Sequence, residues 1–162
     1  MKSRIRALAM DVDGTLTDGS LYLGADGELF KKFNVKDGYA ICDLLPKGEI
    51  IPIVITGRKS RIVSNRCKEL KIQYIIQGST NKLRDLEKVL QKEKISFEET
   101  AYIGDDLNDI ECFQKVAVRG CPSDAVGRIK EVSDFISQFS GGDGAVREFI
   151  EWLLYKDGVV YG

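Results

Sequence analysis

The feature that most constrains the fold of this 162-residue chain is the alternation of short apolar runs with amphipathic segments. Apolar runs bounded by turn residues predict strands at residues 5–10, 50–56, 74–76, 101–104, 116–120 and 134–137. Segments with an apolar stripe predict helices at residues 39–45, 60–70, 81–94, 109–116, 124–132 and 144–156. Strands and helices in alternation are typical of a parallel sheet covered by helices on both faces. We therefore predict an α/β fold, a three-layer sandwich formed by residues 1–162 as a single domain.

A hairpin interrupts this alternation after the first strand. The segment "SLYLGADGELFKKFNV", about residues 20–35, indicates two short strands around the turn Ala25–Asp26–Gly27. Its apolar side chains lie outside the main sheet and are expected to expose more apolar surface than a free hairpin should. They are Leu21, Leu23, Leu29, Phe30 and Phe33.

Helix-breaking residues predict the boundaries that follow the hairpin. Asp37 and Gly38 predict the start of the next helix, and Pro46 and Gly48 predict its end. Pro52, inside the second predicted strand, has no amide hydrogen and predicts that regular strand pairing begins only after it.

The composition is that of a soluble globular protein, with 43% hydrophobic and 30% charged residues. The formal net charge of -1 gives no indication of nucleic-acid or membrane binding. No apolar run approaches the roughly 18 residues needed to span a bilayer. The apolar run near the N-terminus ends at Asp11, too early for a signal peptide, so we expect a cytoplasmic location.

The chain contains no histidine, which excludes Ser-His and Cys-His catalysis and every imidazole metal site. Its four cysteines form no C-x-x-C pair, so they are expected to be small buried apolar residues rather than zinc ligands. An enzyme built from this chain must use carboxylates, lysines or a metal ion to move protons. Oxygen ligands favour Mg²⁺ over zinc or copper.

Charged and polar residues follow the predicted strands at their carboxyl ends. The first strand ends in Asp11 and Asp13, which point the same way on an extended chain and repel each other without a positive partner. The second strand is followed by Thr56–Arg58, the "AYI" strand by residues 104–109, and Lys82 opens a helix between them. In a parallel sheet these residues gather at one edge.

Each of these signals alone has an ordinary explanation, such as a solvated turn, a helix cap or a solvent-facing lysine. Their co-occurrence at successive strand ends points instead to a site for a divalent cation and a phosphate. A cation between Asp11 and Asp105, with Lys82 nearby, would relieve the repulsion among the carboxylates.

The sequence resembles the haloacid dehalogenase superfamily of aspartate-nucleophile phosphohydrolases. "DVDGT" matches the first motif of that superfamily, Thr56 the second, Lys82 the third and "GDDLND" the fourth. The segments "ITGRKS", "QGSTNKL" and "GGDGAVRE" are similar to its small capless branch of sugar-acid phosphatases. The resemblance implies a Rossmann-like capless core with a β-hairpin flap.

The resemblance also implies a role for each matching residue. Asp11 would attack phosphorus, and Asp13 would protonate the leaving alkoxide and then activate water. The implied Mg²⁺ ligands are the Asp11 carboxylate, the Asp13 backbone carbonyl and Asp105. The implied phosphate-binding residues are Thr56, Gly57 and Lys82, and the implied supporting residues are Asp109 and Asn108.

Arg58 bears on the substrate, because a guanidinium beside the phosphate site can hold a carboxylate through two hydrogen bonds. A solvated arginine and an intersubunit ion pair are the alternative explanations. Octulosonate phosphatases of the branch carry arginine after T-G, whereas nonulosonate phosphatases tend to carry glutamate. The resemblance therefore implies 3-deoxy-D-manno-octulosonate 8-phosphate as the substrate, with a nonulosonate (sialic acid or KDN) 9-phosphate as the alternative.

The resemblance further implies a homotetramer, because hairpins of this branch join around a four-fold axis and a capless site lacks a lid of its own. A non-catalytic oligomerisation module is an alternative that the intact acids and Lys82 disfavour. A dinucleotide-binding domain is a further alternative. It is disfavoured because "GGDGAV" does not match the G-x-G-x-x-G motif and follows the last predicted strand rather than the first.

Three departures from the branch stand out. The segment "LLPKGEIIPIVIT" carries an extra residue and unusual prolines, and Glu69 stands where a small residue is expected. The tail is short, so no role is assigned to residues 159–162.

Overall fold

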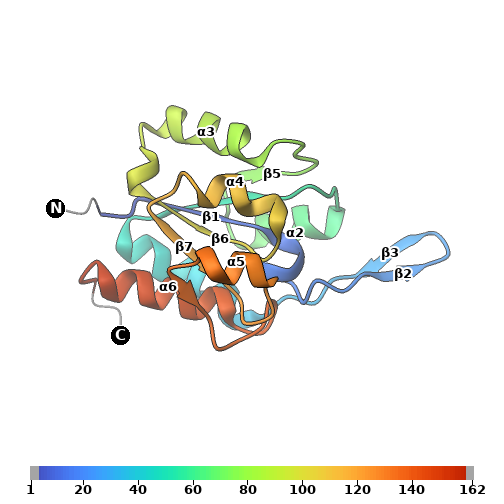
Figure 1. Ribbon diagram of the computed structural model, residues 1–162. Coiled ribbons are helices and arrows are strands. Elements are labelled where there is room, and N and C mark those ends of the chain that lie inside the picture. Colours follow the sequence, from blue (N-terminus) through green and yellow to red (C-terminus); the bar gives the residue numbers. More distant parts are fainter. Residues whose placement is uncertain (1–3, 160–162) are drawn as a thin grey trace.

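The computed structural model describes residues 4–159 and contains a six-stranded sheet in which every strand pair is parallel (Figure 1). The strands lie in the order β5-β4-β1-β6-β7-β8. They are β1 (Ala7–Met10), β4 (Ile51–Ile55), β5 (Tyr74–Ile76), β6 (Thr100–Ile103), β7 (Val118–Cys121) and β8 (Phe135–Ile136). The prediction of an α/β fold with a central parallel sheet is confirmed.

Helices cover both faces of this sheet, and the alternation of side chains along β1 shows how. Leu8 and Met10 pack with residues of α2 and α6, whereas Ala7 and Ala9 pack with residues of α3, α4 and α5. Burying a large apolar side chain such as Leu8 stabilises the fold by roughly 1.5–3 kcal/mol. The helices are α1 (Val35–Tyr39), α2 (Arg61–Glu69), α3 (Lys82–Glu93), α4 (Ile110–Phe113), α5 (Gly127–Val132) and α6 (Ala145–Lys156). The predicted three-layer sandwich is thus confirmed.

The strand order reverses at β1, which decides where a ligand can bind. The chain passes from β1 to β4 and β5 on one side and then returns to β6, β7 and β8 on the other. The carboxyl ends of β1, β4 and β6 therefore lie side by side at one edge. Open parallel sheets bind ligands in the crevice at such a reversal.

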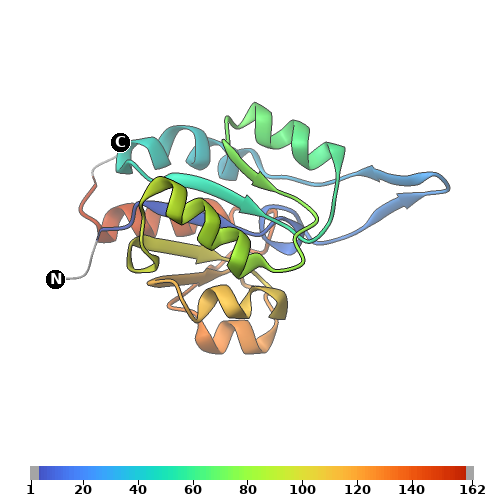
Figure 2. The same cartoon turned by 90° about the horizontal axis from the view of Figure 1, so that it is seen from above.

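The predicted hairpin is present and projects away from the body of the molecule (Figure 2). It consists of β2 (Tyr22–Gly24) and β3 (Gly27–Phe30), joined by the turn at Ala25 and Asp26. The expectation that Phe33 is exposed with the rest of the hairpin was wrong. Phe33 packs against the core, with the Arg66 guanidinium 5.7 Å from its ring centre.

Several boundaries differ from the sequence-based expectation. The helix expected at residues 39–45 starts earlier, at Val35, because the Asn34 side chain caps it by accepting a hydrogen bond from the amide of Lys36. Asp37 therefore lies inside α1. Pro46 does not end the helical segment but lies in the first turn of the helical piece Leu45–Gly48, where its missing amide hydrogen needs no partner. Helices α4 and α5 are also shorter than predicted.

Pro52 lies within β4. The prediction that strand pairing begins only after Pro52 is confirmed on the side of β5 and is wrong on the side of β1. Its neighbour Ile51 donates its amide hydrogen to Arg6 of the segment entering β1, and Pro52 itself is paired with Leu8. On the side of β5 pairing begins at Ile53. Along β4, successive amide hydrogens point alternately toward β1 and toward β5. An amide hydrogen at Pro52 would point toward β5, which has not yet begun at this level, so its absence leaves no strand hydrogen bond unmade.

Of the four cysteines, Cys67, Cys112 and Cys121 are buried as expected, whereas Cys42 is half-buried. No helix within residues 4–159 has the length and apolar character required to cross a bilayer. Residues 160–162 of the short tail lie outside the described part of the chain.

The buried carboxylate of Asp37 ties α1 to the first turn of α6. Its Oδ1 accepts a hydrogen bond from the amide of Arg147 at 2.8 Å, and its Oδ2 is buried with no hydrogen-bond partner among the described residues. Burial raises the pKa of Asp37 to about 6, and the charge of Asp143 acts in the same direction. Hydrogen bonds from the amides of Arg147 and Gly144 and the Arg147 charge oppose this rise.

We predict that wild-type protein loses stability relative to Asp37→Asn as the pH rises. The folded pKa of Asp37 exceeds its unfolded value, so its contribution is fully present below about pH 4 and is lost as the pH rises through about 6. Between about pH 4.5 and pH 7.5 the free energy of urea unfolding of wild type should fall by roughly 2 kcal/mol relative to the variant. Asp26→Asn, in the exposed hairpin turn, is the control. A difference between wild type and Asp37→Asn that does not change with pH would contradict this account.

Candidate active site

Asp11 lies at the carboxyl end of β1, at the edge where the strand order reverses. Its amide donates to the carbonyl of Ile103 on β6 at 3.1 Å, and its side chain is almost fully buried. The chain then turns through Val12–Leu16, with Gly14 in the left-handed region at φ 86°. A Cβ on Gly14 would lie 2.0 Å from a carboxylate oxygen of Asp105, so only glycine allows this close approach.

The buried ammonium of Lys82 is the positive partner of Asp11. Lys82 is the first residue of α3, whose N-cap is the side chain of Asn81. Its Nζ donates to Oδ1 of Asp11 at 2.9 Å and to Oδ1 of Asp109 at 2.8 Å. Burial alone would lower the pKa of Lys82, but the charges of the two carboxylates outweigh it and raise the pKa. Lys82 is therefore a cation in the folded protein.

Asp109 is fully buried, and both of its oxygens are engaged. Oδ1 accepts hydrogen bonds from Lys82 and from the hydroxyl of Tyr102 at 2.7 Å. Oδ2 accepts from the amides of Asp105 at 3.1 Å and Asp106 at 3.4 Å. Asp109 thus holds both the lysine and the loop that follows β6.

Three carboxylates meet beside this lysine. One oxygen from each of Asp11, Asp105 and Asp109 lies within 4.8 Å of the other two. Burial, together with the hydrogen bond and charge of Asp11, raises the pKa of Asp105. Burial and the charge of Asp109 likewise raise the pKa of Asp11, although Lys82 opposes this. The repulsion that raises these pKa values is what a bound cation would remove.

This donor set fits Mg²⁺. Oxygen ligands are those that Mg²⁺ prefers, and it uses one or two carboxylates together with water and substrate oxygens. Because both oxygens of Asp109 are already hydrogen-bonded, the carboxylates left for a cation are those of Asp11 and Asp105. Thr15, whose hydroxyl donates to Asp105 at 3.4 Å, orients the second of them.

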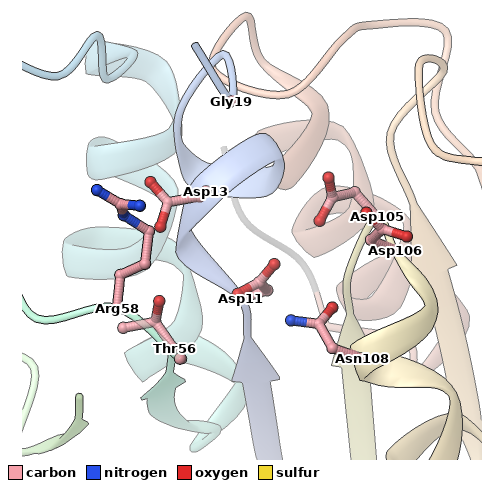
Figure 3. Close-up of a pocket in the computed structure, with 9 residues that line it drawn as sticks. Asp11, Asp13, Gly19, Thr56, Arg58, Asp105, Asp106 and Asn108 are labelled. Carbon is pink, nitrogen blue, oxygen red and sulfur yellow. The ribbon is translucent and has the colours of Figure 1, made fainter. Parts of the chain in front are cut away.

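The carboxylates open into a cavity of about 280 Å³ (Figure 3). Asp11 lies at its centre, with Asp105, Asp106 and Asn108 to one side and Asp13, Thr56 and Arg58 to the other. The residues that line it are Asp11, Asp13, Gly19, Thr56, Gly57, Arg58, Asp105, Asp106 and Asn108. The mixture of acids with a single arginine suits a small polar ligand that carries negative charge and binds with a cation.

The structure brings the residues singled out from the sequence into one place. Seven of them line the cavity, whereas Lys82 and Asp109 are buried; Lys82 contacts Asp11, and Asp109 is connected to Asp11 through Lys82. Glu69 is exposed and pairs with Arg66 on α2, so it is not part of the cavity.

Sequence reasoning missed several contributors. Asp106 stands inside the quoted "GDDLND" segment but was given no role, and Gly19 follows the "DVDGT" segment. Tyr102, inside an apolar strand, and Lys31, in the hairpin, carry no signal in the sequence. Their contacts with Asp109 and Asp13 depend on segments that are distant along the chain.

Comparison with known proteins agrees with this geometry. The family model that describes haloacid dehalogenase-like hydrolases matches residues 71–150 of this sequence. The 3-deoxy-D-manno-octulosonate 8-phosphate phosphatase of Escherichia coli (strain K12) is 43% identical over 155 residues, which cover 95% of this chain and 81% of that protein. The chain belongs to the haloacid dehalogenase-like hydrolases. The same-named phosphatase of Yersinia pestis is 36% identical to this hydrolase over 152 residues, covering 94% of this chain and 81% of the other.

Solved structures of relatives share the fold of this hydrolase. The 3-deoxy-D-manno-octulosonate 8-phosphate phosphatase of Moraxella catarrhalis, in complex with a magnesium ion, a phosphate ion and a KDO molecule, aligns with a TM-score of 0.88 at 40% identity. The alignment covers 93% of this chain and 86% of that one. The corresponding phosphatase of Yersinia pestis aligns with a TM-score of 0.91 at 36% identity, covering 95% and 83% of the two chains.

We predict that Mg²⁺ raises the melting temperature of this hydrolase and that Asp105→Asn removes most of the rise. Ligand at about 100 times its Kd stabilises by about 2.7 kcal/mol. For a chain of this size that corresponds to roughly 5–10 °C. In EDTA the variant should melt no lower than wild type, because it lacks the repulsion with Asp11. Asp26→Asn is the control, and an undiminished Mg²⁺ shift in Asp105→Asn would show that the ion binds elsewhere.

Proposed function

We propose that this hydrolase removes phosphate from 3-deoxy-D-manno-octulosonate 8-phosphate, through an aspartyl-phosphate intermediate and with Mg²⁺. The observation that carries the proposal is the buried Asp11 carboxylate, paired with Lys82 at the floor of an open acidic cavity, with Asp13 two residues away on the cavity wall. The names of the E. coli and M. catarrhalis relatives support the substrate, and the magnesium and phosphate ions of the latter support the cofactor and the reaction. A charged sugar acid phosphate does not cross membranes unaided, so we also propose a cytoplasmic location.

The first half-reaction is phosphoryl transfer to Asp11. A carboxylate oxygen of Asp11 forms a bond to phosphorus while the bond from phosphorus to the sugar oxygen breaks. Asp13 donates a proton to that oxygen, so the sugar acid leaves as a neutral alcohol group. Lys82, Thr56 and Gly57 bind the phosphoryl oxygens and compensate their charge.

The second half-reaction releases phosphate. Asp13, now a carboxylate, takes a proton from a water molecule whose oxygen attacks phosphorus. The bond from phosphorus to Asp11 breaks, which restores both carboxyl groups. The side chains of Asp11 and Asp105 and the backbone carbonyl of Asp13 would hold Mg²⁺, which would supply positive charge against the phosphoryl oxygens. Asp109 and Asn108 support this arrangement without contacting phosphorus.

Asp11→Asn should abolish turnover while the protein stays folded, because an amide keeps the shape of the side chain but cannot attack phosphorus. Asp13→Asn should slow both half-reactions, since it removes the acid and the base together. Steady-state assays with p-nitrophenyl phosphate measure this, with EDTA to silence the wild type and Mg²⁺ to restore it. Normal turnover by purified Asp11→Asn would refute the mechanism.

Arg58 is proposed to bind the substrate carboxylate. Its exposed side chain lines the cavity on the same side as Asp13, at a distance from the Asp105 side (Figure 3). Arg58→Ala should lose roughly ten- to a hundredfold in kcat/KM for the octulosonate substrate, about 1.5–3 kcal/mol for a charged hydrogen-bonding partner. Activity on p-nitrophenyl phosphate, which has no carboxylate, should barely change. Equal losses on both substrates would place Arg58 in the phosphate site, and a preference of wild type for a nonulosonate 9-phosphate would change the substrate.

A homotetramer formed through the hairpin is the proposed assembly of this single domain. Leu21, Leu23, Leu29 and Phe30 are 49%, 59%, 63% and 53% exposed, which favours burial against other copies. Light scattering should therefore give about 72 kDa, four times the 18.1 kDa chain. Leu29→Glu should dissociate the assembly, whereas Tyr155→Glu, at an exposed apolar position on α6, should not. A wild-type mass of one chain at micromolar concentration would exclude the tetramer.

A further inference from the structure

A buried lysine at the base of the hairpin contacts the proposed acid–base residue. Lys31 directly follows β3, and its side chain is only 1% exposed. Its Nζ donates to Oδ1 of Asp13 at 2.6 Å and lies 2.9 Å from Oε1 of Glu28. Removing an ammonium from water is costly unless acidic partners surround it. The two carboxylates are therefore what allow Lys31 to occupy this position.

Glu28 connects this lysine to the loop that follows β4. Burial raises the pKa of Glu28, but interactions with Lys31, Ser60 and the charge of Arg58 outweigh it and keep that pKa below its ordinary value. Ser60 is also the N-cap of α2, so it is fixed by the body of the molecule. Lys31 and Glu28 thus connect the hairpin to Asp13 on the cavity wall and to the start of α2.

The orientation of Asp13 follows from these contacts. Its side chain is turned toward the Arg58 side of the cavity and away from Asp105 (Figure 3). The side chain is 22% exposed, and an unpartnered carboxylate with that much freedom would populate several rotamers. A short charged hydrogen bond to a buried ammonium selects one of them.

We infer that Lys31 is a positioning residue of the phosphatase reaction, which holds the Asp13 carboxyl group where it gives a proton to the leaving oxygen and then, as a carboxylate, takes one from the attacking water. The inference rests on the proposed function, because it assumes that Asp13 is the acid and base. It gives the hairpin a role in the chemistry of its own subunit, separate from any role in assembly. A fixed catalytic group contributes to rate because small displacements cost a large factor in reactivity.

Lys31→Met tests the inference, because methionine keeps the apolar stem of lysine and removes the ammonium. The variant should lose roughly ten- to a hundredfold in kcat on the sugar-acid phosphate, with KM nearly unchanged. Lys31→Arg should recover part of the loss, because it restores a cationic donor. Lys32→Met is the matched control, since Lys32 is the adjacent and exposed lysine, and it should behave as wild type.

A double-mutant cycle separates positioning from a structural role. If Lys31 acts through Asp13, then adding Lys31→Met to Asp13→Asn should lower the residual activity on p-nitrophenyl phosphate less than threefold. If instead the two losses multiply in the double variant, Lys31 acts independently of Asp13 and the inference is wrong. Melting temperature and light scattering establish that the variants fold and assemble alike, and Lys31→Gln replaces Lys31→Met in the cycle if the latter does not fold.

The outcomes distinguish this inference from the proposed function. Wild type that hydrolyses no phosphate monoester, or Asp13→Asn with full activity, would refute the proposed function itself. An active wild type and an impaired Asp13→Asn, together with a fully active Lys31→Met, would refute only the role of Lys31.

Discussion

The buried ammonium of Lys82 between Asp11 and Asp109 is the interaction on which the rest of the site depends. Two carboxylates at these distances and this burial would repel strongly without a cation between them. Removing one member of such a buried set costs several kcal/mol, about 3–5, because it leaves an unpaired charge. The contact can form only where the end of β1, the loop after β6 and the start of α3 meet. The parallel sheet and its reversal at β1 create that meeting point.

The segment before α6 packs against the loop that follows Asp11. A Cβ on Gly141 would lie 2.0 Å from the carbonyl oxygen of Gly14, and one on Gly142 would lie 2.5 Å from the amide of Asp18. The amide of Gly142 also donates to the carbonyl of Thr15 at 3.2 Å. The "GGDG" segment before α6 is therefore glycine-rich because backbone packs directly on backbone there. This contact couples the position of α6 to the geometry around Asp11.

The hairpin combines two kinds of surface that serve different purposes. Its strands carry exposed apolar side chains, and at their base Tyr22 and Phe30 form a stacked pair with ring centres 4.3 Å apart. The hairpin also carries the half-buried Glu28 and the buried Lys31, and Lys31 contacts Asp13 on the cavity wall. The projecting hairpin is thereby connected to Asp13 through Lys31, while its exposed apolar side chains are available for contact with other chains.

The sequence by itself determined the sheet, the sandwich and the identity of most residues in the cavity. Apolar periodicity is a local property, and the ends of parallel strands must share an edge, so Asp11, Thr56 and Asp105 could be brought together without coordinates. Only the tertiary structure decided that both oxygens of Asp109 are engaged and that Lys31 holds Asp13. These contacts depend on side-chain direction and on segments remote along the chain, neither of which follows from spacing. The start of α1 likewise depended on the Asn34 cap, and the pairing of Pro52 depended on where β5 begins. A local sequence pattern specifies neither a side-chain cap nor the neighbouring strand.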